Sequence, residues 1–518
     1  MALLRFLRLE FCSSEFVFLV FAFLFLVPVS GLKRQAASVN ETVTFNVLVM
    51  SKLRPDSSGQ AFEERAASQV AAQNVSHATA LAKIVHRNSL SSSVQHINAS
   101  RQELMIETIL RDEARFSSIL MQINRPVSGE VRGTHKLHVD QHQRKTPAQD
   151  FEAPIFSGLA FGTGEYFAVV GVGTPRRDMY LVVDTGSDIT WLQCAPCTNC
   201  YKQKDALFNP SSSSSFKVLD CSSSLCLNLD VMGCLSNKCL YQADYGDGSF
   251  TMGELVTDNV VLDDAFGPGQ VVLTNIPLGC GHDNEGTFGT AAGILGLGRG
   301  PLSFPNNLDA STRNIFSYCL PDRESDPNHK STLVFGDAAI PHTATGSVKF
   351  IPQLRNPRVA TYYYVQITGI SVGGNLLTNI PASVFQLDSH GNGGTIFDSG
   401  TTITRLEARA YTAVRDAFRA ATMHLTSAAD FKIFDTCYDF TGMNSISVPT
   451  VTFHFQGDVD MRLPPSNYIV PVSNNNIFCF AFAASMGPSV IGNVQQQSFR
   501  VIYDNVHKQI GLLPDQCS

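Results

Sequence analysis

The chain has 518 residues, of which 44% are hydrophobic and 16% charged, and this composition excludes an intrinsically disordered protein. The length exceeds that of one ordinary domain. The formal net charge of −7 argues against nucleic acid or an anionic membrane surface as the main partner and leaves the substrate open.

Residues 1–31 have the pattern of a secretory signal peptide. Arg5 and Arg8 precede an apolar stretch, 16–29, which two small residues follow. The stretch is shorter than the ~20 apolar residues of a membrane span, so a signal anchor is the weaker alternative. We expect a protein of the secretory pathway that has no stable membrane anchor and is extracellular, with the endoplasmic reticulum or a vacuole as alternatives.

Residues 32–150 contain no cysteine and hold the three N-x-S/T sequons of the chain, at Asn40, Asn74 and Asn98. The segment ends in a basic, histidine-rich stretch, 125–149, that is typical of an exposed linker open to proteases. We interpret 32–150 as a removable prosegment rather than a permanent domain.

Within this prosegment, residues 101–125 are predicted to form an amphipathic helix. Its apolar residues recur near the helical period: Met105, Ile109, Phe116, Leu120 and Ile123. The charged residues fall mainly on other positions: Arg111, Asp112, Glu113 and Arg115.

Three histidines, His135, His138 and His142, lie in the linker stretch. They are poor candidates for a metal site, because the segment has no predicted structure to hold them. The sharper hypothesis is that they become charged as the pH falls and loosen the prosegment.

After residue 151, short apolar runs alternate with clusters of Gly, Pro, Ser, Asn and Asp. Examples are 166–171, 180–183 and 362–367. This texture predicts a mainly β fold with many hairpins, and 407–422 is the clearest helix.

Two acidic signatures in this region read as copies of each other. Residues 182–187 and 396–401 each have an apolar run, then Asp, a hydroxyl residue, Gly and a second hydroxyl residue. The apolar run predicts a buried strand, and the glycine allows a tight turn that exposes the Asp at its end. Two such carboxylates, Asp184 and Asp398, can carry out general acid/base hydrolysis with an activated water.

The duplication extends beyond the acidic signatures. An apolar-apolar-Gly element follows each Asp, in 293–298 and in 490–493. We therefore expect two related β lobes, 151–345 and 346–518, that each bring one Asp and one such element to a shared cleft.

Cysteines provide a further framework for the two lobes. Twelve of them lie between Cys194 and Cys517, and an even number in a secreted chain predicts disulfides. Zinc at Cys194, Cys197 and Cys200 is the weaker alternative, because the compartment oxidises thiols and further cysteines follow closely. We expect no metal and no cofactor. The predicted disulfide cysteines are Cys194, Cys197, Cys200, Cys221, Cys226, Cys234, Cys239, Cys280, Cys319, Cys437, Cys479 and Cys517.

With these motifs in order, the chain resembles a pepsin-type aspartic protease over roughly residues 160–515. Residues 245–249, Tyr-Gly-Asp-Gly-Ser, match the flap of that family, and Trp191 stands where the family has a Trp that supports the flap tyrosine. The chain is similar in particular to the plant atypical, nepenthesin-like subgroup. Four segments and the cysteine-rich insertion after Asp184 carry that similarity: 245–250, 279–286, 434–438 and 492–497.

The resemblance implies a bilobal pepsin-like fold with an active-site cleft between two β-barrel-like lobes, preceded by a partly helical prosegment. It implies an endopeptidase that is made as a zymogen, acts on polypeptide substrates in acid, is a monomer and reaches the apoplast. A catalytically inert binder on the same fold, similar to the plant xylanase inhibitors, is the alternative.

The resemblance also assigns roles to the residues around the two Asp. Thr185 and Ser399, a Ser where many members have Thr, would bond across the lobe interface. Ser187 and Thr401 would bond the outer carboxylate oxygens, and Gly186 and Gly400 would direct N–H groups at the carboxylates. Tyr245 would cover the substrate, and Trp191 would pack beneath it.

Six disulfides follow from the resemblance alone. They are Cys194–Cys197, Cys200–Cys280, Cys221–Cys239, Cys226–Cys234, Cys319–Cys517 and Cys437–Cys479.

Overall fold

Strands are the main regular structure after residue 150, as the turn-rich texture predicts. The computed structural model describes residues 41–46, 79–80, 100–124, 150–157, 165–245, 248–265, 268–286, 288–308, 312–322, 331–341, 348–514 and 517. All of these belong to one compact unit, Val39–Ser518. Among them, no helix is both long enough and apolar enough to span a bilayer. The signal peptide, the linker and its three histidines lie outside the described residues.

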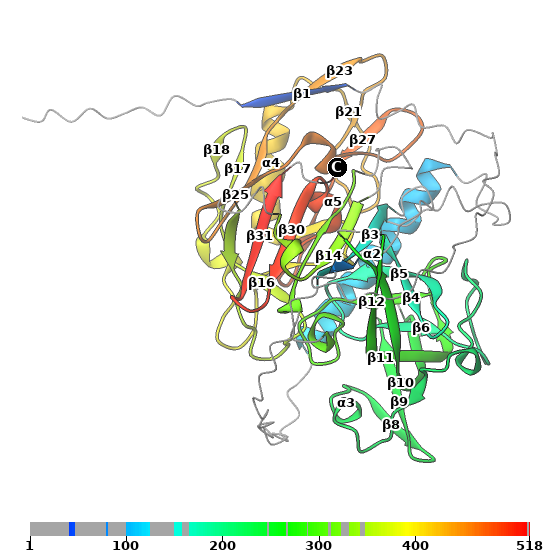
Figure 1. Ribbon diagram of the computed structural model, residues 1–518. Helices are drawn as coiled ribbons and strands as arrows, with labels where there is room; N and C mark the ends of the chain where they lie inside the picture. The colour runs from blue at the N-terminus through cyan, green and yellow to red at the C-terminus, as the bar shows by residue number, and fades with distance from the viewer. Residues whose placement is uncertain are drawn as a thin grey trace, which may run out of the picture. The chain divides into compact units, whose positions relative to one another are not determined.

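The largest sheet has 16 strands (Figure 1). Fourteen follow one path, in the order β15-β31-β30-β13-β14-β3-β4-β5-β12-β6-β11-β10-β9-β8, while β2 pairs with β3 and β7 with β10. Its strands are β2 (Thr79–Ala80), β3 (Asp150–Ser157), β4 (Tyr166–Val172), β5 (Arg177–Asp184), β6 (Trp191–Gln193), β7 (Lys217–Val218), β8 (Met232–Leu235), β9 (Lys238–Asp244), β10 (Phe250–Asp263), β11 (Gln270–Glu285), β12 (Gly293–Gly296), β13 (Ile315–Cys319), β14 (Ser331–Phe335), β15 (Lys349–Pro352), β30 (Phe499–Asp504) and β31 (Gln509–Pro514). The last two strands of the chain thus join the sheet of the first lobe through β13.

The second lobe contributes three smaller sheets, whose orders are β16-β19-β29-β20-β28, β18-β17-β24-β25 and β21-β22-β27-β26. Their strands are β16 (Tyr363–Val365), β17 (Ile367–Val372), β18 (Asn375–Leu376), β19 (Thr395–Phe397), β20 (Thr404–Glu407), β21 (Ser427–Ala428), β22 (Cys437–Asp439), β24 (Val451–Phe455), β25 (Val459–Arg462), β26 (Ile469–Pro471), β27 (Ile477–Phe480), β28 (Phe482–Ser485) and β29 (Ser489–Ile491). All residues of β19 and β29 are buried, which explains why these two strands are mostly apolar.

In the described part of the chain, α-helices are few, as the sequence predicts. They are α2 (Arg101–Asn124), α3 (Ser224–Leu227), α4 (Ala408–Ala421) and α5 (Asn493–Gln496). Helix α2 begins with a capping box, in which Ser100 Oγ accepts from Glu103 N at 3.2 Å and Glu103 Oε2 accepts from Ser100 N at 2.7 Å. The predicted helices at 101–125 and 407–422 are both present.

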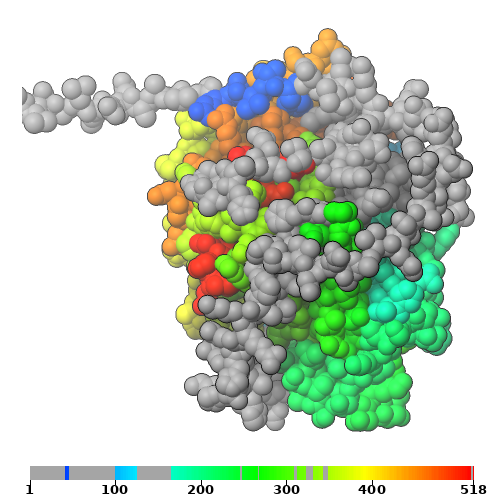
Figure 2. Space-filling model, viewed as in Figure 1, coloured from blue at the N-terminus to red at the C-terminus, as the bar shows by residue number. Residues whose placement is uncertain are grey.

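The expected prosegment contacts the second lobe at two places. Helix α2 packs its apolar face there, and strand β1 (Thr42–Asn46) pairs antiparallel with β23 (Ser445–Pro449). In Figure 2 the blue residues of β1 lie on the orange residues of this lobe.

All twelve expected cysteines form disulfides, but only two of the six predicted pairs occur, Cys319–Cys517 and Cys437–Cys479. The other four predicted pairs, Cys194–Cys197, Cys200–Cys280, Cys221–Cys239 and Cys226–Cys234, are wrong. The structure has Cys194–Cys280, Cys197–Cys200, Cys221–Cys234 and Cys226–Cys239 instead.

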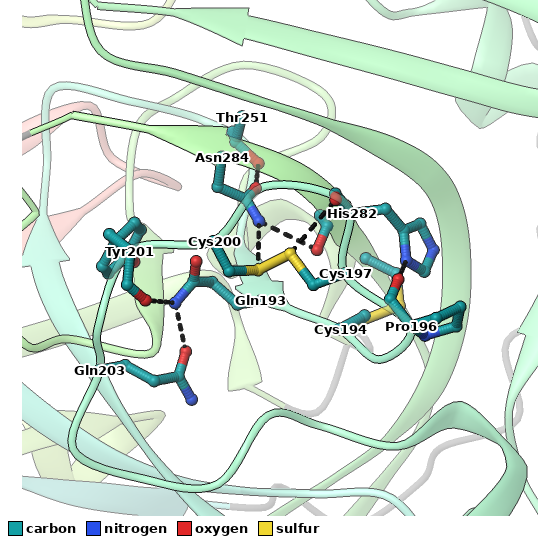
Figure 3. Close-up of a disulfide and its surroundings, with 12 residues drawn as sticks. Gln193, Cys194, Pro196, Cys197, Cys200, Tyr201, Gln203, Thr251, His282 and Asn284 are labelled. Carbon is teal, nitrogen blue, oxygen red and sulfur yellow. Dashed lines mark hydrogen bonds between the residues drawn. A yellow bond between two sulfur atoms is a disulfide. The ribbon is translucent and has the colours of Figure 1, made fainter.

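Strand register explains the pairing after Asp184. Strand β6 runs parallel to β11 with Leu192 beside Cys280, so Cys194 comes within 5.4 Å of Cys280, measured between Cα atoms. Cys197 and Cys200 then close the short loop between them, next to Asn284 and His282 (Figure 3).

The two disulfides Cys226–Cys239 and Cys221–Cys234 of the cysteine-rich insertion differ in burial. Cys226 of α3 and Cys239 of β9 are both fully buried and bond to each other. The more accessible Cys221 bonds to Cys234 of β8.

Candidate active site

The two acidic signatures lie at the ends of equivalent strands. Strand β5 ends at Asp184, and β19 ends one residue before Asp398. Each pairs in parallel with its apolar-apolar-Gly strand, β12 or β29, which pairs antiparallel with β6 or β20 in turn. The predicted duplication is therefore present strand for strand.

Hydrogen bonds between the lobes hold the two turns together. Thr185 N donates to Ser399 Oγ at 3.1 Å, and Ser399 N donates to Thr185 Oγ1 at 2.9 Å. Ser399 Oγ also donates to Val183 O at 2.9 Å. Because each hydroxyl bonds the backbone of the opposite turn, the Ser at 399 serves here as a Thr would.

Each carboxylate is also bonded within its own turn. Ser187 Oγ donates to Asp184 Oδ2 at 2.5 Å, and Thr401 Oγ1 donates to Asp398 Oδ2 at 2.6 Å. The N–H groups of the two glycines donate to the inner oxygens, Gly186 to Asp184 Oδ1 at 2.9 Å and Gly400 to Asp398 Oδ1 at 3.0 Å.

The glycines also show that the two carboxylates face each other. A Cβ on Gly186 would lie 2.7 Å from Asp398 Oδ1, and one on Gly400 would lie 2.4 Å from Asp184 Oδ1. Any side chain at either glycine would therefore displace the carboxylate of the opposite lobe.

The expected flap residues meet as the sequence predicts. Trp191 Nε1 donates to Tyr245 Oη at 2.8 Å, and both rings pack edge-on against Phe288, with centroids 5.0 and 5.2 Å apart. A cavity of about 60 Å³ remains between Tyr245, Asp184 and helix α2.

The sequence prediction missed Arg115 of helix α2, which lies between the two carboxylates. Its Nη2 is 2.5 Å from Asp184 Oδ1 and 3.4 Å from Asp398 Oδ1, and its Nε is 3.3 Å from Asp398 Oδ2. The only signal in the sequence was a charged residue next to the apolar position Phe116.

A second charged residue of the helix, Asp112, is fully buried, contrary to the prediction that the charges avoid the packed face. Its Oδ1 accepts from Thr402 N at 2.6 Å and Ile403 N at 3.0 Å, and its Oδ2 accepts from Arg405 Nη2 at 2.9 Å. Charge pairing thus overrides the apolar pattern at this turn of α2.

Apolar contacts fix the helix on the second lobe. Met105 and Ile109 pack in one cluster with Ile403, and Phe116, Ile119 and Ile123 pack in another with Tyr362 and Val490. Towards the first lobe, Arg115 bonds Asp184, and Arg111 lines the cavity beside it.

The pKa values of Asp184 and Arg115 depend on their burial and on the charges beside them. Burial raises the pKa of Asp184 above its ordinary value, the charge of Arg115 opposes this, and the charge of Asp398 adds to it. Burial alone would lower the pKa of Arg115, but the charges of Asp184 and Asp398 raise it above its ordinary value. Arg115 therefore stays charged and favours ionised carboxylates.

Comparisons with known proteins agree with this geometry. Residues 166–337 match the family model "Xylanase inhibitor N-terminal", and residues 362–513 match "Xylanase inhibitor C-terminal". Protein ASPARTIC PROTEASE IN GUARD CELL 2 of Arabidopsis thaliana is 41% identical over 79% of this chain and 82% of its own length. The chain belongs to the plant aspartyl protease family.

Two further comparisons place the chain within that family. Aspartic proteinase nepenthesin-1 of Nepenthes gracilis is 38% identical over 74% of this chain and 84% of its own length, which confirms the nepenthesin-like resemblance. The crystal structure of a protein named edgp superposes with a TM-score of 0.58 at 20% identity, covering 70% of this chain and 94% of that one. The mainly β, pepsin-like fold is thereby confirmed, and at the level of the family the function is that of an aspartic protease.

Proposed function

We propose that the protein is an aspartic endopeptidase in which Asp184 and Asp398 form one catalytic dyad. The observation that carries this proposal is the reciprocal bonding of the two turns, which presents two buried carboxylates to each other across the lobe interface. Polypeptides are the substrates, and the proposal requires no cofactor.

Two carboxylates that face each other cannot both stay ionised, because their like charges repel. The pair therefore shares a proton, as is known for aspartic protease dyads. The ionised carboxylate takes a proton from a water held between the two Asp. The water oxygen attacks the scissile carbonyl carbon, while the protonated carboxylate donates a hydrogen bond to the carbonyl oxygen. The gem-diol collapses as the amide nitrogen receives a proton, so no acyl-enzyme forms.

In the described structure the dyad is blocked, which supports synthesis as a zymogen. The guanidinium of Arg115 occupies the space where the water and the scissile carbonyl would lie. As the pH falls through the raised pKa of Asp184, that carboxylate gains a proton and its ion pair with Arg115 weakens. Acid would thus loosen α2 from the dyad.

The proposed division of the chain is a signal peptide at 1–31, a prosegment at 32–150 and lobes at 151–345 and 346–518. Strand β3 pairs with both β4 and β14, so it belongs with the first lobe. We propose cleavage within 125–149 and secretion of a monomer, with the apoplast as its destination. Mass spectrometry and N-terminal sequencing of the secreted protein test this; a mature chain beginning beyond Ser157 would contradict it.

Hydrolysis of a peptide mixture at acid pH tests the enzymatic function. Purified protein freed of residues 32–150 should cleave peptides, while Asp184→Asn and Asp398→Asn should not. Asp430→Asn, an exposed residue, is the matched control and should behave as the parent. No cleavage by the parent would favour the inert inhibitor suggested by the family-model names, and cleavage by Asp184→Asn would reject the dyad.

A further inference from the structure

Helix α2 brings three charged residues to the cleft, Arg111, Asp112 and Arg115, and of these Arg115 bonds the dyad. Asp112, three residues earlier, lies on the second lobe, where Arg405 and two backbone N–H groups bind its carboxylate. We propose that Arg405 with the N–H groups of Thr402 and Ile403 forms a carboxylate-binding subsite, which directs the enzyme to substrates with Asp or Glu near the scissile bond. This inference rests on the proposed function.

The donors of this subsite are already arranged around a carboxylate. Three donors converge on the two oxygens of one carboxylate at 2.6 to 3.0 Å, and the side chains of Arg405 and Asp112 are 7% and 0% exposed. Charge-assisted bonds to a guanidinium and to paired N–H groups are the strong form of carboxylate recognition.

Removal of α2 leaves these donors without their acceptor. The guanidinium of Arg405 lies 4.8 Å from the ring centroid of Phe116, so its ring contact, like its ion pair, belongs to α2. Arg405 Nε has no acceptor among the described residues even with the helix in place. With α2 gone, the guanidinium and the two N–H groups lack the acceptor that Asp112 supplied, so the emptied site favours a new carboxylate.

Its position in the duplicated fold places this subsite on the cleft. Arg405 follows Asp398 by seven residues and lies beside Val490 of β29. Trp191 follows Asp184 by seven residues and lies beside Ile294 of β12. Thr402, whose N–H group is one of the three donors, lines the same cavity as Asp184, so the subsite lies at the cleft.

The distance to the dyad sets which substrate residue can reach the subsite. Asp112 and Arg115 are three residues apart on a helix, which is about 4.5 Å along its axis. An extended peptide advances about 3.3 Å per residue, so the acidic residue is expected within two or three residues of the scissile bond.

Two matched peptide sets test the proposal on the protein freed of its prosegment. One set is cleavable, and the other has a reduced scissile bond, so that binding is measured whether or not the protein cleaves. Each set carries Asp or Asn at each of three positions on either side of the bond, with an amidated or a free C-terminus. At one position, the Asp peptide should be cleaved and bound about 10- to 100-fold better than its Asn partner.

Variants then assign that preference to Arg405. Arg405→Gln should abolish the Asp preference and Arg405→Lys should retain part of it, each measured as the ratio between the Asp peptide and its Asn partner within one protein. Cleavage without any Asp preference in the parent would overturn the subsite and leave the proposed function standing. Preferential binding without cleavage would support the subsite and count against the endopeptidase. A preference that follows only the free C-terminus would overturn the assignment to a side chain.

Discussion

The two active-site loops, 184–191 and 398–405, are near copies that differ sharply at two positions. Four residues after Asp184 or Asp398, the first loop has Asp188 and the second has Thr402, and after seven residues they have Trp191 and Arg405. Asp188 accepts from Gly300 N at 2.8 Å and from Thr361 Oγ1 at 2.7 Å. Thr402 N instead donates to a carboxylate supplied by α2.

Because of this difference, the two loops are contacted by different parts of the chain. The first loop is completed by groups of the proposed mature enzyme, including the flap residue Tyr245. The second is completed in the described structure by Asp112 and Phe116 of helix α2. The conserved part of the duplication builds the dyad, and the divergent part determines what lies against each side of the cleft.

The largest expected effect tests the equivalence of the two loops. Asp184→Asn and Asp398→Asn should each lower kcat/KM about 1,000-fold or more, and the double variant should lose little beyond either single one, because the pair acts as a unit. Steady-state kinetics on one peptide substrate measures this. Additive losses would show that the two carboxylates act separately.

The next effect concerns Asp188, which has no counterpart in the second loop. Burial, opposed by the bonds from Thr361 and Gly300, raises its pKa to about 6. The folded state thus binds this proton more tightly than the unfolded state, so stability is greatest below about pH 4 and falls as the pH rises towards 6.

Asp188→Asn should flatten this fall, which is at most about 3 kcal/mol. Urea denaturation from pH 3.5 to 7 measures it, with Asp398→Asn in both proteins to prevent self-digestion. Parallel pH profiles with and without Asp188 would contradict the assignment.

Arg115→Gln tests whether the ion pairs of Arg115 with Asp184 and Asp398 keep α2 on the dyad. Without the guanidinium the two carboxylates lose their shared cation, so the midpoint pH of processing should rise by roughly one unit. Gel analysis of processing against pH measures it, and Arg409→Gln, at an arginine of α4 that is 64% exposed, is the control. An unchanged midpoint would show that Arg115 does not restrain activation.

Tyr245→Phe tests whether the bond between Trp191 of the first loop and Tyr245 helps to close the cleft over the substrate. The variant keeps the ring packed on Phe288 but loses the bond from Trp191 Nε1, so kcat/KM should fall about fivefold. The same substitution at Tyr468, a buried tyrosine of the second lobe, should leave kcat/KM within twofold. Equal effects at both positions would indicate a general loss of stability.

Local patterns were enough to predict the strands, the helix at 101–125 and the residues of both Asp turns. The turns are encoded by consecutive residues, so their bonds follow once the strands form. Disulfide pairing in the first lobe depended on the register of β6 against β11, which no local pattern records. Arg115 and Asp112 were missed because the helical period marks an apolar face but not the charges that a neighbouring lobe will pair.

Titration calorimetry with a transition-state analogue, a peptide with a hydroxymethylene group at the scissile position, tests the central claim that α2 closes a working dyad. We predict no detectable binding to the full-length protein at neutral pH, binding by the full-length Arg115→Gln variant, and tight binding once residues 32–150 are removed. Equally tight binding before and after their removal would contradict the blocked dyad.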